Sequence, residues 1–276
     1  MPGTLFLVAV PIGNPDDLSP RALAVMRAAD VVAAEDTRHF ATLARRHSLA
    51  TRALSYHDHN EAERTATLVE RLRAGEDVAL VSDAGTPLIS DPGYRLVRAA
   101  IDAGIEVTSV PGASAVTTAL AASGLPPHPF RFVGFLPRTA AARRALLKSL
   151  AGDPATLVAF EAPRRLTDAL RDARSTLGDR PACLARNLTK PHERYQRGTL
   201  SELVADLEAE GEVRGEATLV IAGATATQDD SDDAEADARL LLKGGAPARA
   251  VQSLLIERRG LSRRAAYDLV LRLRRE

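Results

Sequence analysis

SDAGTPLISDPG, residues 82–93, is the stretch that decides the fold of this chain. It follows the apolar run Val78–Val81, a predicted strand, and precedes a predicted helix at Pro92–Ala103. Its two glycines allow positive φ or a close backbone approach, while its two prolines fix φ. An ordinary strand-to-helix turn needs only about 2–6 residues, with Asp91 as the expected N-cap of the helix. The remaining residues, 82–90, predict a ligand-binding loop at the carboxyl end of a strand.

Apolar runs rich in Val, Ile and Leu alternate with amphipathic windows along most of the chain, a pattern typical of α/β proteins. The turn-rich segment GLPPHP, residues 124–129, divides this pattern into two halves. Strands are expected at Leu5–Val10, Val31–Ala34, Arg52–Ser55, Val78–Val81, Glu106–Val110, Arg131–Phe135, Thr156–Phe160, Ala182–Arg186 and Ala217–Ala222. Helices are expected at Pro20–Ala28, Phe40–Arg46, Glu61–Ala74, Pro92–Ala103, Ala113–Ala122, Arg143–Leu150, Arg164–Leu177 and Leu200–Ala209, with a helix pair at Ala246–Arg258 and Ser262–Arg274 around a break at Gly260.

Charge divides the chain, although its net charge is zero. Residues 225–238 carry six acidic and no basic side chains, which is typical of a solvated linker, and residues 239–276 carry ten basic and three acidic ones. We therefore expect an N-terminal α/β domain at 1–123, a second α/β domain at 124–224, an acidic linker at 225–238 and a basic helical module at 239–276. The basic module favours a polyanionic partner; a solvated helical face is the alternative.

Cysteine usage and hydropathy indicate the compartment. The single cysteine, Cys183, excludes an internal disulfide framework and a cysteine-based zinc cluster. The N-terminus has no basic segment before its apolar run, so no signal peptide is expected. No apolar run approaches the roughly 20 residues of a membrane helix. These features favour a cytoplasmic protein with no membrane partner.

A polar or turn-rich cluster follows each of the first five predicted strands. If these strands are parallel, the clusters meet at one edge of one sheet and form a substrate cleft. The clusters are PIGN (Pro11–Asn14), EDTRH (Glu35–His39), YHDHN (Tyr56–Asn60), SDAGTP (Ser82–Pro87) and VPGASA (Val110–Ala115).

Several common ligand motifs are absent. The chain has neither the GxGxxG of dinucleotide-binding folds, nor the phosphate-binding GxxxxGK[ST], nor the GxSxG of serine hydrolases. His57 and His59 are two positions apart but lack further ligands nearby, so no metal is expected. Asn60 with Glu63, and Thr199 with Glu202, have the spacing of capping boxes and predict helix N-termini.

Lys190 stands out because only three of the 36 basic residues are lysine. It lies in the polar stretch RNLTKPHERYQRG, residues 186–198, after a predicted strand. An ammonium group can lose a proton where a guanidinium cannot. Lys190 is therefore a candidate general base, with chance placement as an equal alternative.

Nine segments together resemble the tetrapyrrole methylase superfamily, and more closely its bacterial branch that methylates the ribose 2′-hydroxyl of a cytidine in small-subunit (16S) ribosomal RNA. They lie within residues 4–223 and read VAVPIGNPDDLSPRAL, AEDTRH, SYHDHNE, SDAGTPLISDPG, VPGASA, SGLP, GFLPR, LTKPHE and RGTLSEL. The chain departs from the pattern in FEAPRRL, residues 160–166, where aromatic-Glu-Ser-Pro-His-Arg is expected. It departs again in RNLTK, residues 186–190, where an acid is expected before the leucine.

The resemblance implies an α/β fold of two domains that hold S-adenosylmethionine in the cleft between them, and a homodimer. Backbone N–H groups where a helix begins would donate to the methionine carboxylate. On the matching positions, the residues implied to bind the cofactor are Pro11, Gly13, Asp83, Gly85, Thr86, Pro87, Ile89, Ser114, Ala115 and Phe160.

The implied reaction transfers a methyl group from a sulfonium to a ribose oxygen, and a base is expected because the hydroxyl is hardly ionised at neutral pH. The candidate catalytic residues are Lys190, Glu35 and Asp36. His57 and Glu193 are further rivals for the proton acceptor, and the sequence does not rank them. Candidate contacts to the RNA substrate are Arg38, His57, Asn60, Arg138 and Arg165, with Arg143 and Arg144 as further phosphate contacts.

Two alternatives remain open. A tetrapyrrole or other small-molecule methyltransferase could use the same fold, but the basic C-terminal module argues against it. A ribosome-binding protein without catalysis could carry the same basic module, but the intact SDAGTP loop argues against that, because a pure binder needs no cofactor pocket.

Overall fold

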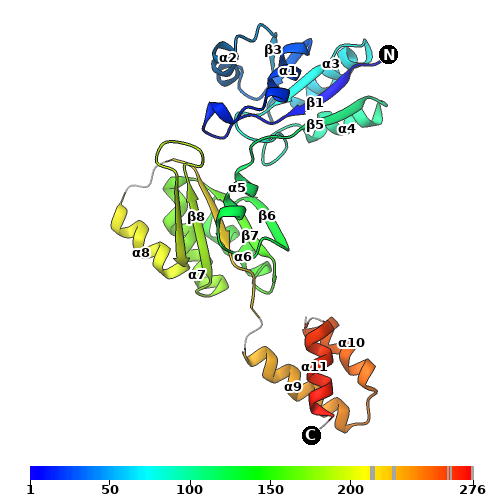
Figure 1. Cartoon of the computed structure of the whole chain (residues 1–276), viewed down its shortest axis with the longest axis vertical. Coiled ribbons are helices and arrows are strands. Elements are labelled where there is room, and N and C mark those ends of the chain that lie inside the picture. Colours follow the sequence, from blue (N-terminus) through cyan, green and yellow to red (C-terminus); the bar gives the residue numbers. More distant parts are fainter. Residues whose placement is uncertain (212–214, 226–227, 260, 262, 275–276) are drawn as a thin grey trace. The chain divides into compact units, whose positions relative to one another are not determined.

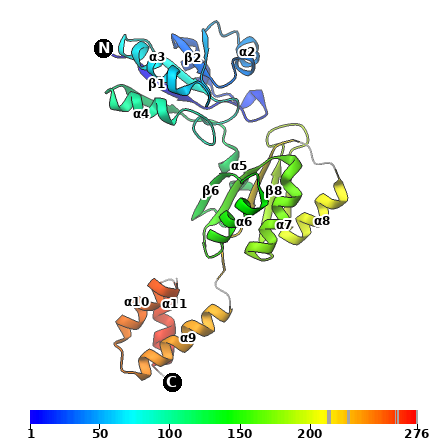
Figure 2. The same ribbon diagram turned by 180° about the vertical axis from the view of Figure 1, so that it is seen from behind.

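The computed structural model describes residues 1–211, 215–225, 228–259, 261 and 263–274. It divides into two compact units, residues 1–223 and residues 224–276 (Figures 1 and 2). The larger unit contains two five-stranded sheets, and the smaller unit is helical in its described residues.

The first sheet is wholly parallel, as the sequence predicts. Its strands are β1 (Thr4–Val8), β2 (Val31–Ala34), β3 (Ala53–Ser55), β4 (Val78–Val81) and β5 (Glu106–Val110), in the spatial order β3-β2-β4-β1-β5. Every residue of β2 and β4 is buried, as expected for a parallel strand that helices cover on both faces. The helices α1 (Pro20–Ala28) and α2 (Thr37–Arg46) pack on one face, and α3 (Glu61–Arg73) and α4 (Tyr94–Asp102) on the other.

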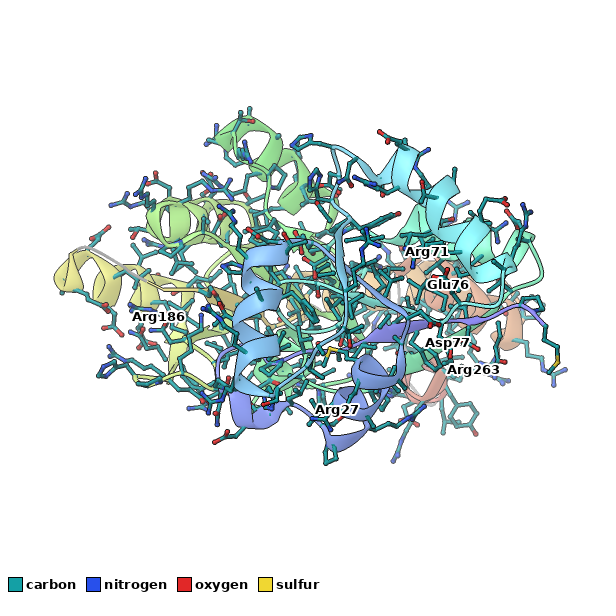
Figure 3. The ribbon with its side chains drawn as sticks, turned by 90° about the horizontal axis from the view of Figure 1, so that it is seen from above. Arg27, Arg71, Glu76, Asp77, Arg186 and Arg263 are labelled. Carbon is teal, nitrogen blue, oxygen red and sulfur yellow. The ribbon has the colours of Figure 1, made fainter. Side chains whose placement is uncertain are left out.

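The amino ends of the strands are tied together by polar contacts. The Asp77 carboxylate accepts from Thr4 N at 2.7 Å, and the Asp30 carboxylate accepts from Asp77 N at 2.8 Å. Arg71 and Glu76, beside Asp77 in Figure 3, form an ion pair at 2.5 Å. The polar side chains at this edge contact each other and the backbone. The loops at the opposite edge, where the strands have their carboxyl ends, are therefore the better candidates for a ligand-binding site.

The second sheet is mixed. Its strands are β6 (Phe130–Phe135), β7 (Thr156–Glu161), β8 (Pro181–Arg186), β9 (Arg194–Thr199) and β10 (Ala217–Ile221), in the order β6-β7-β10-β8-β9. Only β6 and β7 pair in parallel. The helices α6 (Ala140–Ser149), α7 (Leu166–Leu177) and α8 (Leu200–Glu210) cover one face. On the other face α5 (Ala115–Ala122) packs against Val158, Cys183 and Val220, although the predicted boundary at residue 123 placed it with the first domain.

Three local predictions differ from the structure. Strand β9 was expected as loop, because its run RYQRGT is polar and only Gln196 is buried. Asp91 is not a helix cap, since α4 begins at Tyr94 after Gly93 and has no side-chain cap. The capping box at Asn60 is also wrong: its side chain accepts from His57 N and donates to Ser55 O. The box at Thr199 and Glu202 is confirmed.

The C-terminal unit holds three helices in its described residues: α9 (Gln228–Lys243), α10 (Ala248–Arg259) and α11 (Arg263–Leu273). Ala234 and Ala238, one helical turn apart on α9, are buried in its core with Val251, Leu255 and Val270. Most of the linker predicted at 225–238 is therefore helix. Ala234 and Ala238 are buried in the core of the unit, which the acidic composition of this stretch did not indicate. The expected break at Gly260 and the helix start at Ser262 lie outside the described residues.

None of the helices in the described residues combines the length and the apolar character needed to cross a membrane. The helices of the C-terminal unit are instead amphipathic, with a small apolar core and charged outer positions.

Candidate functional site

The loops after β1, β4 and β5 are fastened to one another at the carboxyl edge of the first sheet. Val10 N donates to Gly85 O at 2.9 Å, and Gly85 N donates to Val10 O at 3.0 Å. The hydroxyl of Thr86 donates to Ala113 O at 3.2 Å. Parallel pairing thus brings three of the five predicted clusters together, and backbone hydrogen bonds fix their relative positions; no residue of the cluster at Tyr56–Asn60 lines either cavity described below.

The loop at residues 82–93 has the compact, constrained backbone that its glycines and prolines indicate. Gly85 has a φ of +76°, and a Cβ there would lie 3.2 Å from Ile12 Cγ2. Leu88 and Ser90 also have positive φ, which side-chain-bearing residues adopt rarely and at a cost. Such a conformation is typical of a ligand-binding loop held by the structure around it.

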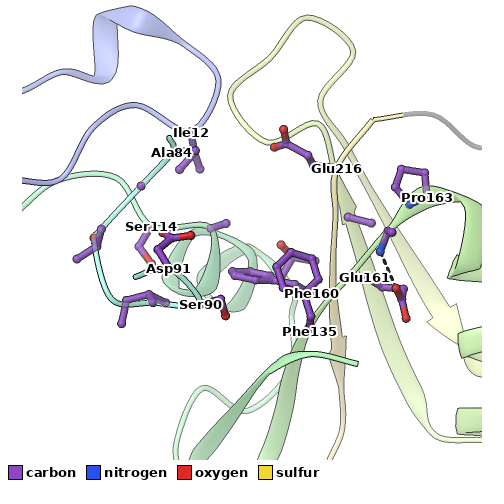
Figure 4. A pocket seen from close by; sticks show the side chains of 17 residues that line it. Ile12, Ala84, Ser90, Asp91, Ser114, Phe135, Phe160, Glu161, Pro163 and Glu216 are labelled. Atoms are coloured by element: carbon purple, nitrogen blue, oxygen red, sulfur yellow. Dashed lines mark hydrogen bonds between the residues drawn. The ribbon is translucent and has the colours of Figure 1, made fainter. Parts of the chain in front are cut away.

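A cavity of about 360 Å³, here called the first cavity, lies between the loops of the first sheet and the strands of the second (Figure 4). One wall is made by Ile12, Ala84, Gly85, Thr86, Ile89, Ser90, Asp91, Ser114 and Ala115. The opposite wall is made by Phe135, Phe160, Glu161, Ala162, Pro163, Glu216, Ala217 and Thr218. The aromatic rings of Phe135 and Phe160 lie edge to face, with centroids 5.4 Å apart.

The cavity fits a nucleoside-containing cofactor in its chemistry. Phe160 supplies an apolar surface for a base, and the start of α5 at Ser114 and Ala115 places backbone N–H groups at its wall. The missing side chain at Gly85 keeps the loop close to Ile12. Of the cofactor residues expected from the sequence, those that line this cavity are Gly85, Thr86, Ile89, Ser114, Ala115 and Phe160.

The other expected cofactor residues lie elsewhere. Pro11, Gly13 and Asp83 line a second cavity of about 600 Å³, and Pro87 is not among the residues that line either one. The second cavity is also lined by Asp36, His39, Arg46 and Lys190, and it shares Ile12, Ala84 and Glu216 with the first cavity. The two cavities therefore adjoin at these three shared residues.

Lys190 reaches the second cavity because residue 13 is glycine. A Cβ at Gly13 would lie 2.5 Å from Lys190 Cγ and 2.7 Å from Leu188 O. The ammonium of Lys190 forms an ion pair with Glu216 at 2.7 Å. This pair places the Lys190 side chain beside Glu216, which lines both cavities.

The two carboxylates expected as alternative bases differ from each other. Asp36 caps α2 and accepts hydrogen bonds from Arg38, whose side chain and backbone hold the pKa of Asp36 well below its usual range. Glu35 accepts from Asp83 N at 3.2 Å, and burial raises the pKa of Glu35. Glu35 is thus the better proton acceptor of the two, although it is not among the residues that line either cavity.

Ligand atoms of Asp36, His39 and Asp83 lie within 4.8 Å of one another. Their contacts account for this cluster without a metal, since Asp36 pairs with Arg38 and Asp83 accepts from His39 at 3.0 Å and from Asp36 N at 3.0 Å. The expectation that the chain binds no metal stays a prediction.

The side chains expected to contact RNA are scattered. Arg38 and Arg138 are exposed, while His57 and Asn60 hydrogen-bond within their own loop. Arg165 pairs at 2.5 Å with the buried Glu161. The prediction for Arg143 is wrong, because its side chain is buried and pairs with Asp172 at 2.5 Å, and Arg144 joins the same carboxylate at 3.0 Å.

Sequence reasoning missed Asp91, Phe135 and Glu216, all of which line the first cavity. Burial raises the pKa of Asp91 to about 7, with the neighbouring carboxylates of Glu35, Asp83 and Asp58 adding to the effect and a hydrogen bond with Ser82 opposing it. The position of Asp91 directly after the predicted ligand loop, residues 82–90, was the available signal; its resemblance to a helix cap concealed it.

Comparison with known proteins gives a consistent result. The model of the tetrapyrrole (corrin/porphyrin) methylases matches residues 4–204. The chain belongs to the tetrapyrrole methylase family. A ribosomal RNA small subunit methyltransferase I from Micromonospora olivasterospora is 53% identical to it, over 97% of this chain and 86% of the relative. One from Mycobacterium bovis is 48% identical, over 99% and 96%.

Solved structures of the tetrapyrrole methylase family show the same fold. A crystal structure of uroporphyrin-III C-methyltransferase from Thermus thermophilus, complexed with S-adenosyl homocysteine, superposes with a TM-score of 0.56 at 24% identity. The superposition covers 80% of this chain and 97% of the Thermus thermophilus chain. That likeness establishes the arrangement of the two sheets.

One departure from the expected tetrapyrrole methylase pattern has a structural explanation. Asn187 stands where an acid was expected, has a φ of +52°, and donates from its backbone N to Glu216 O at 3.1 Å. Asparagine tolerates this left-handed conformation better than most residues. A Cβ at Gly215 would lie 1.8 Å from Asn187 Oδ1, so Asn187 and Gly215 fit each other.

Gly85→Val should weaken cofactor binding by at least about 30-fold, because valine disfavours positive φ and its branched side chain would meet Ile12 at the cavity wall. Isothermal titration calorimetry with S-adenosylmethionine measures this. Gly104→Val is the matched control, since Gly104 has a φ of +70° with nothing within 4 Å of its Cβ position. Equal affinities of the two variants would remove the loop from the binding site.

Proposed function

We propose that this chain is an S-adenosylmethionine-dependent methyltransferase that methylates the ribose 2′-hydroxyl of a cytidine in 16S ribosomal RNA. The observation that carries the proposal is the first cavity, which the loop at residues 82–93 and Phe160 enclose in a chain of this family. The substrate class is supported by the ribosomal RNA small subunit methyltransferases that are 53% and 48% identical to this chain over nearly its whole length. We place its action in the cytoplasm, where ribosomal RNA is found.

The first cavity is the cofactor site in this proposal. Bound S-adenosylmethionine supplies a methyl group activated by the sulfonium charge. Thr86, Ile89 and the backbone at Ser114 would hold it on the side of the first sheet, and Phe160 would contact it from the second. Pro87 acts indirectly, by fixing the backbone of the loop beside Thr86.

The second cavity receives the ribose. It adjoins the first cavity at Ile12, Ala84 and Glu216, so a hydroxyl there lies beside the cofactor site. Holding the hydroxyl in line can account for much of the acceleration. Lys190 and Glu216 form the ionisable pair at this junction. Lys190 takes the proton of the hydroxyl after it passes its own proton to Glu216 or to solvent, and Glu35 is the alternative acceptor.

The C-terminal unit docks the RNA through α10 and α11. Arg249, Arg263 and Tyr267 line a groove on α10 and α11, and the Tyr267 side chain is exposed. Other arginines of the unit are paired: Arg259 with Asp237, and Arg272 with Glu235. Among the described residues no ion pair involves Arg249 or Arg263. Guanidinium groups beside an exposed ring suit phosphates and stacked bases.

The chain also forms a homodimer in this proposal. Ile101, Phe130 and Phe135 are large apolar side chains that are exposed on the larger unit. Burial of such side chains against a second copy is a common way to remove apolar surface from water. Light scattering at micromolar concentration determines the oligomeric state.

Methyl transfer to RNA tests the proposal directly. Tritium from labelled S-adenosylmethionine should appear in small ribosomal subunits or in 16S RNA, and nucleoside analysis should recover it as 2′-O-methylcytidine. Label in a tetrapyrrole, with none in RNA, would assign the chain to small-molecule methylation. Retention of RNA without any transfer would leave a binding protein.

Lys190→Met should lower turnover by at least about 100-fold, because the site loses its proton acceptor. Cofactor affinity should change little, since Lys190 lines only the second cavity. Lys148→Met, at an exposed position of α6, is the matched control and should retain activity. A small effect of Lys190→Met together with a large effect of Glu35→Gln would transfer the role to Glu35.

The double variant Arg249→Ala/Arg263→Ala should weaken RNA binding and reduce the slope of log affinity against log salt by about 1.4–1.8, because two phosphate contacts are lost. Filter binding over a range of salt concentrations measures this. Arg73→Ala, an exposed arginine of α3, is the control. An unchanged slope in the double variant would mean that the arginines of this groove are solvated and do not bind RNA.

A further inference from the structure

The loop after β8, residues 187–193, has an unusual backbone. Asn187, Thr189 and His192 all have positive φ, at +52°, +61° and +71°. Asparagine tolerates this conformation, but threonine rarely adopts it because its side chain is branched at Cβ. Strain of this kind persists only where the surrounding structure imposes it, and it is concentrated at functional sites. The contacts that hold Thr189 in this conformation therefore bear on the function of the loop.

The hydroxyl of Thr189 connects the two sheets. It accepts a hydrogen bond from Asn14 N, in the loop after β1, at 2.9 Å. Among the described residues, this is the one hydrogen bond between the second sheet and the loops at the carboxyl edge of the first. Loss of the hydroxyl would leave Asn14 N without its acceptor and would disconnect the two loops.

The loop after β1 and the loop after β8 also pack closely. A Cβ at Gly13 would lie 2.5 Å from Lys190 Cγ and 2.8 Å from Thr189 Oγ1. Both side chains therefore lie directly against the backbone of Gly13. Because Thr189 and Lys190 are neighbours in the chain, a shift of Thr189 away from this backbone would displace Lys190 as well.

Glu193 holds the same loop from its other end. Its carboxylate accepts from Thr189 N at 2.9 Å and hydrogen-bonds with the hydroxyl of Tyr195 on β9. Its backbone N donates to Lys190 O at 3.1 Å, and Lys190 N donates to Asn187 O at 2.9 Å. Hydrogen bonds therefore fix the backbone on both sides of Lys190. Glu193 itself is not among the residues that line either cavity, so these contacts are its role in this loop.

The contacts of the loop determine where the ammonium of Lys190 lies. This group pairs with Glu216 at 2.7 Å, and Glu216 lines both cavities. Figure 4 shows Glu216 across the first cavity from Ile12, which also lines both. A lysine side chain is long and flexible, and that of Lys190 is 32% exposed. The position of its ammonium therefore depends on how firmly its backbone is held.

We infer that Thr189 and Glu193 are positioning residues, which hold Lys190 at the junction of the two cavities by fastening the loop after β8 to the loop after β1. The inference rests on the proposed function, in which Lys190 accepts the proton of the ribose hydroxyl. Neither positioning residue lines a cavity, so both act through Lys190. A glycine at position 189 would relieve the backbone strain, but it would lack the hydroxyl that binds Asn14 N.

The first test compares Thr189→Ser with Thr189→Ala, which both remove the branch at Cβ and differ from each other only in the hydroxyl group. Thr189→Ser should keep turnover within about threefold of the wild-type value, and Thr189→Ala should lower it by about 10- to 100-fold, because the proton acceptor is displaced. Calorimetry should show the same affinity of both variants for S-adenosylmethionine, since Thr189 does not line the first cavity.

Glu193 is tested by a similar pair. Glu193→Ala should lower turnover to the same extent as Thr189→Ala, and Glu193→Gln should restore most of it, because the amide oxygen can still accept from Thr189 N. Thr67→Ala and Glu63→Ala, at exposed positions of α3, are the matched controls and should retain full turnover.

A double-mutant cycle with Lys190→Met separates positioning from a merely structural role. In the Lys190→Met background, Thr189→Ala and Thr189→Ser should turn over at the same rate, because neither can act through a missing amine. A structural role of the hydroxyl would instead lower the rate of Thr189→Ala again in this background.

Chemical labelling of Lys190 tests the inference without turnover. The chain has three lysines, Lys148, Lys190 and Lys243, so acetylation by acetic anhydride can be followed at each of them by peptide mass spectrometry. Lys190 should be acetylated at least about threefold faster in Thr189→Ala than in Thr189→Ser, because the loop opens more often once its hydrogen bond is lost. The exposed Lys148 is the internal reference.

Either of two results would overturn the inference: equal turnover by Thr189→Ser and Thr189→Ala in a chain whose activity requires Lys190, or equal acetylation of Lys190 in these two variants. Full activity of Lys190→Met, or no methyl transfer to RNA by the wild-type chain, would instead contradict the proposed function. The acetylation rates would then still decide whether the hydroxyl of Thr189 holds Lys190 in place.

Discussion

The backbone contact between Val10 and Gly85 is the constraint on which both cavities depend. Parallel pairing brings the carboxyl ends of β1 and β4 side by side, and the two reciprocal hydrogen bonds between these residues then join the loops that follow. Ile12, two residues after Val10, and Ala84, directly before Gly85, line both cavities. A side chain at position 85 would press on Ile12, so the same contact that fixes the site also requires a glycine.

The fold was predictable from the sequence where burial was strong. Apolar runs such as VVAA and VALV are typical of strands covered on both faces, and their bounds, Val31–Ala34 and Val78–Val81, agree with the prediction. Polar elements were not predictable in this way. Strand β9 buries little and is held by pairing with β8 across the sheet, and the start of α9 is acidic although its later alanines are buried. The hydropathy of a segment indicates neither its pairing with a neighbouring strand nor the burial of a few alanines on one face of a helix.

In the candidate site, the backbone geometry was predictable from the sequence, but the electrostatic environment of the side chains was not. Loop composition indicated the positions that need special backbone geometry, Gly85 and Thr86 among them, because glycine and proline encode conformation locally. The electrostatic environment is not local. The pKa of Asp91 depends on burial and on Glu35, which lies far from it in the chain and meets it only because β2 and β4 are neighbours in the sheet. A single sequence gives no such distances, so a carboxylate that lines the first cavity was interpreted as a helix cap.

The positions of the charged side chains decide which of them pair with each other. They separate pairs with a buried partner from side chains that face a cavity. Arg143 with Asp172, and Arg165 with Glu161, are pairs with a buried partner, and such groups must be matched within the fold because isolated charge is costly to desolvate. Asp91 and Lys190 face cavities, so each can exchange its partner for a ligand. Lys190 already pairs with Glu216, whereas no ion pair among the described residues involves Asp91. Burial without a partner cation disfavours the charged form of Asp91, and this raises the pKa of its carboxyl group to about 7.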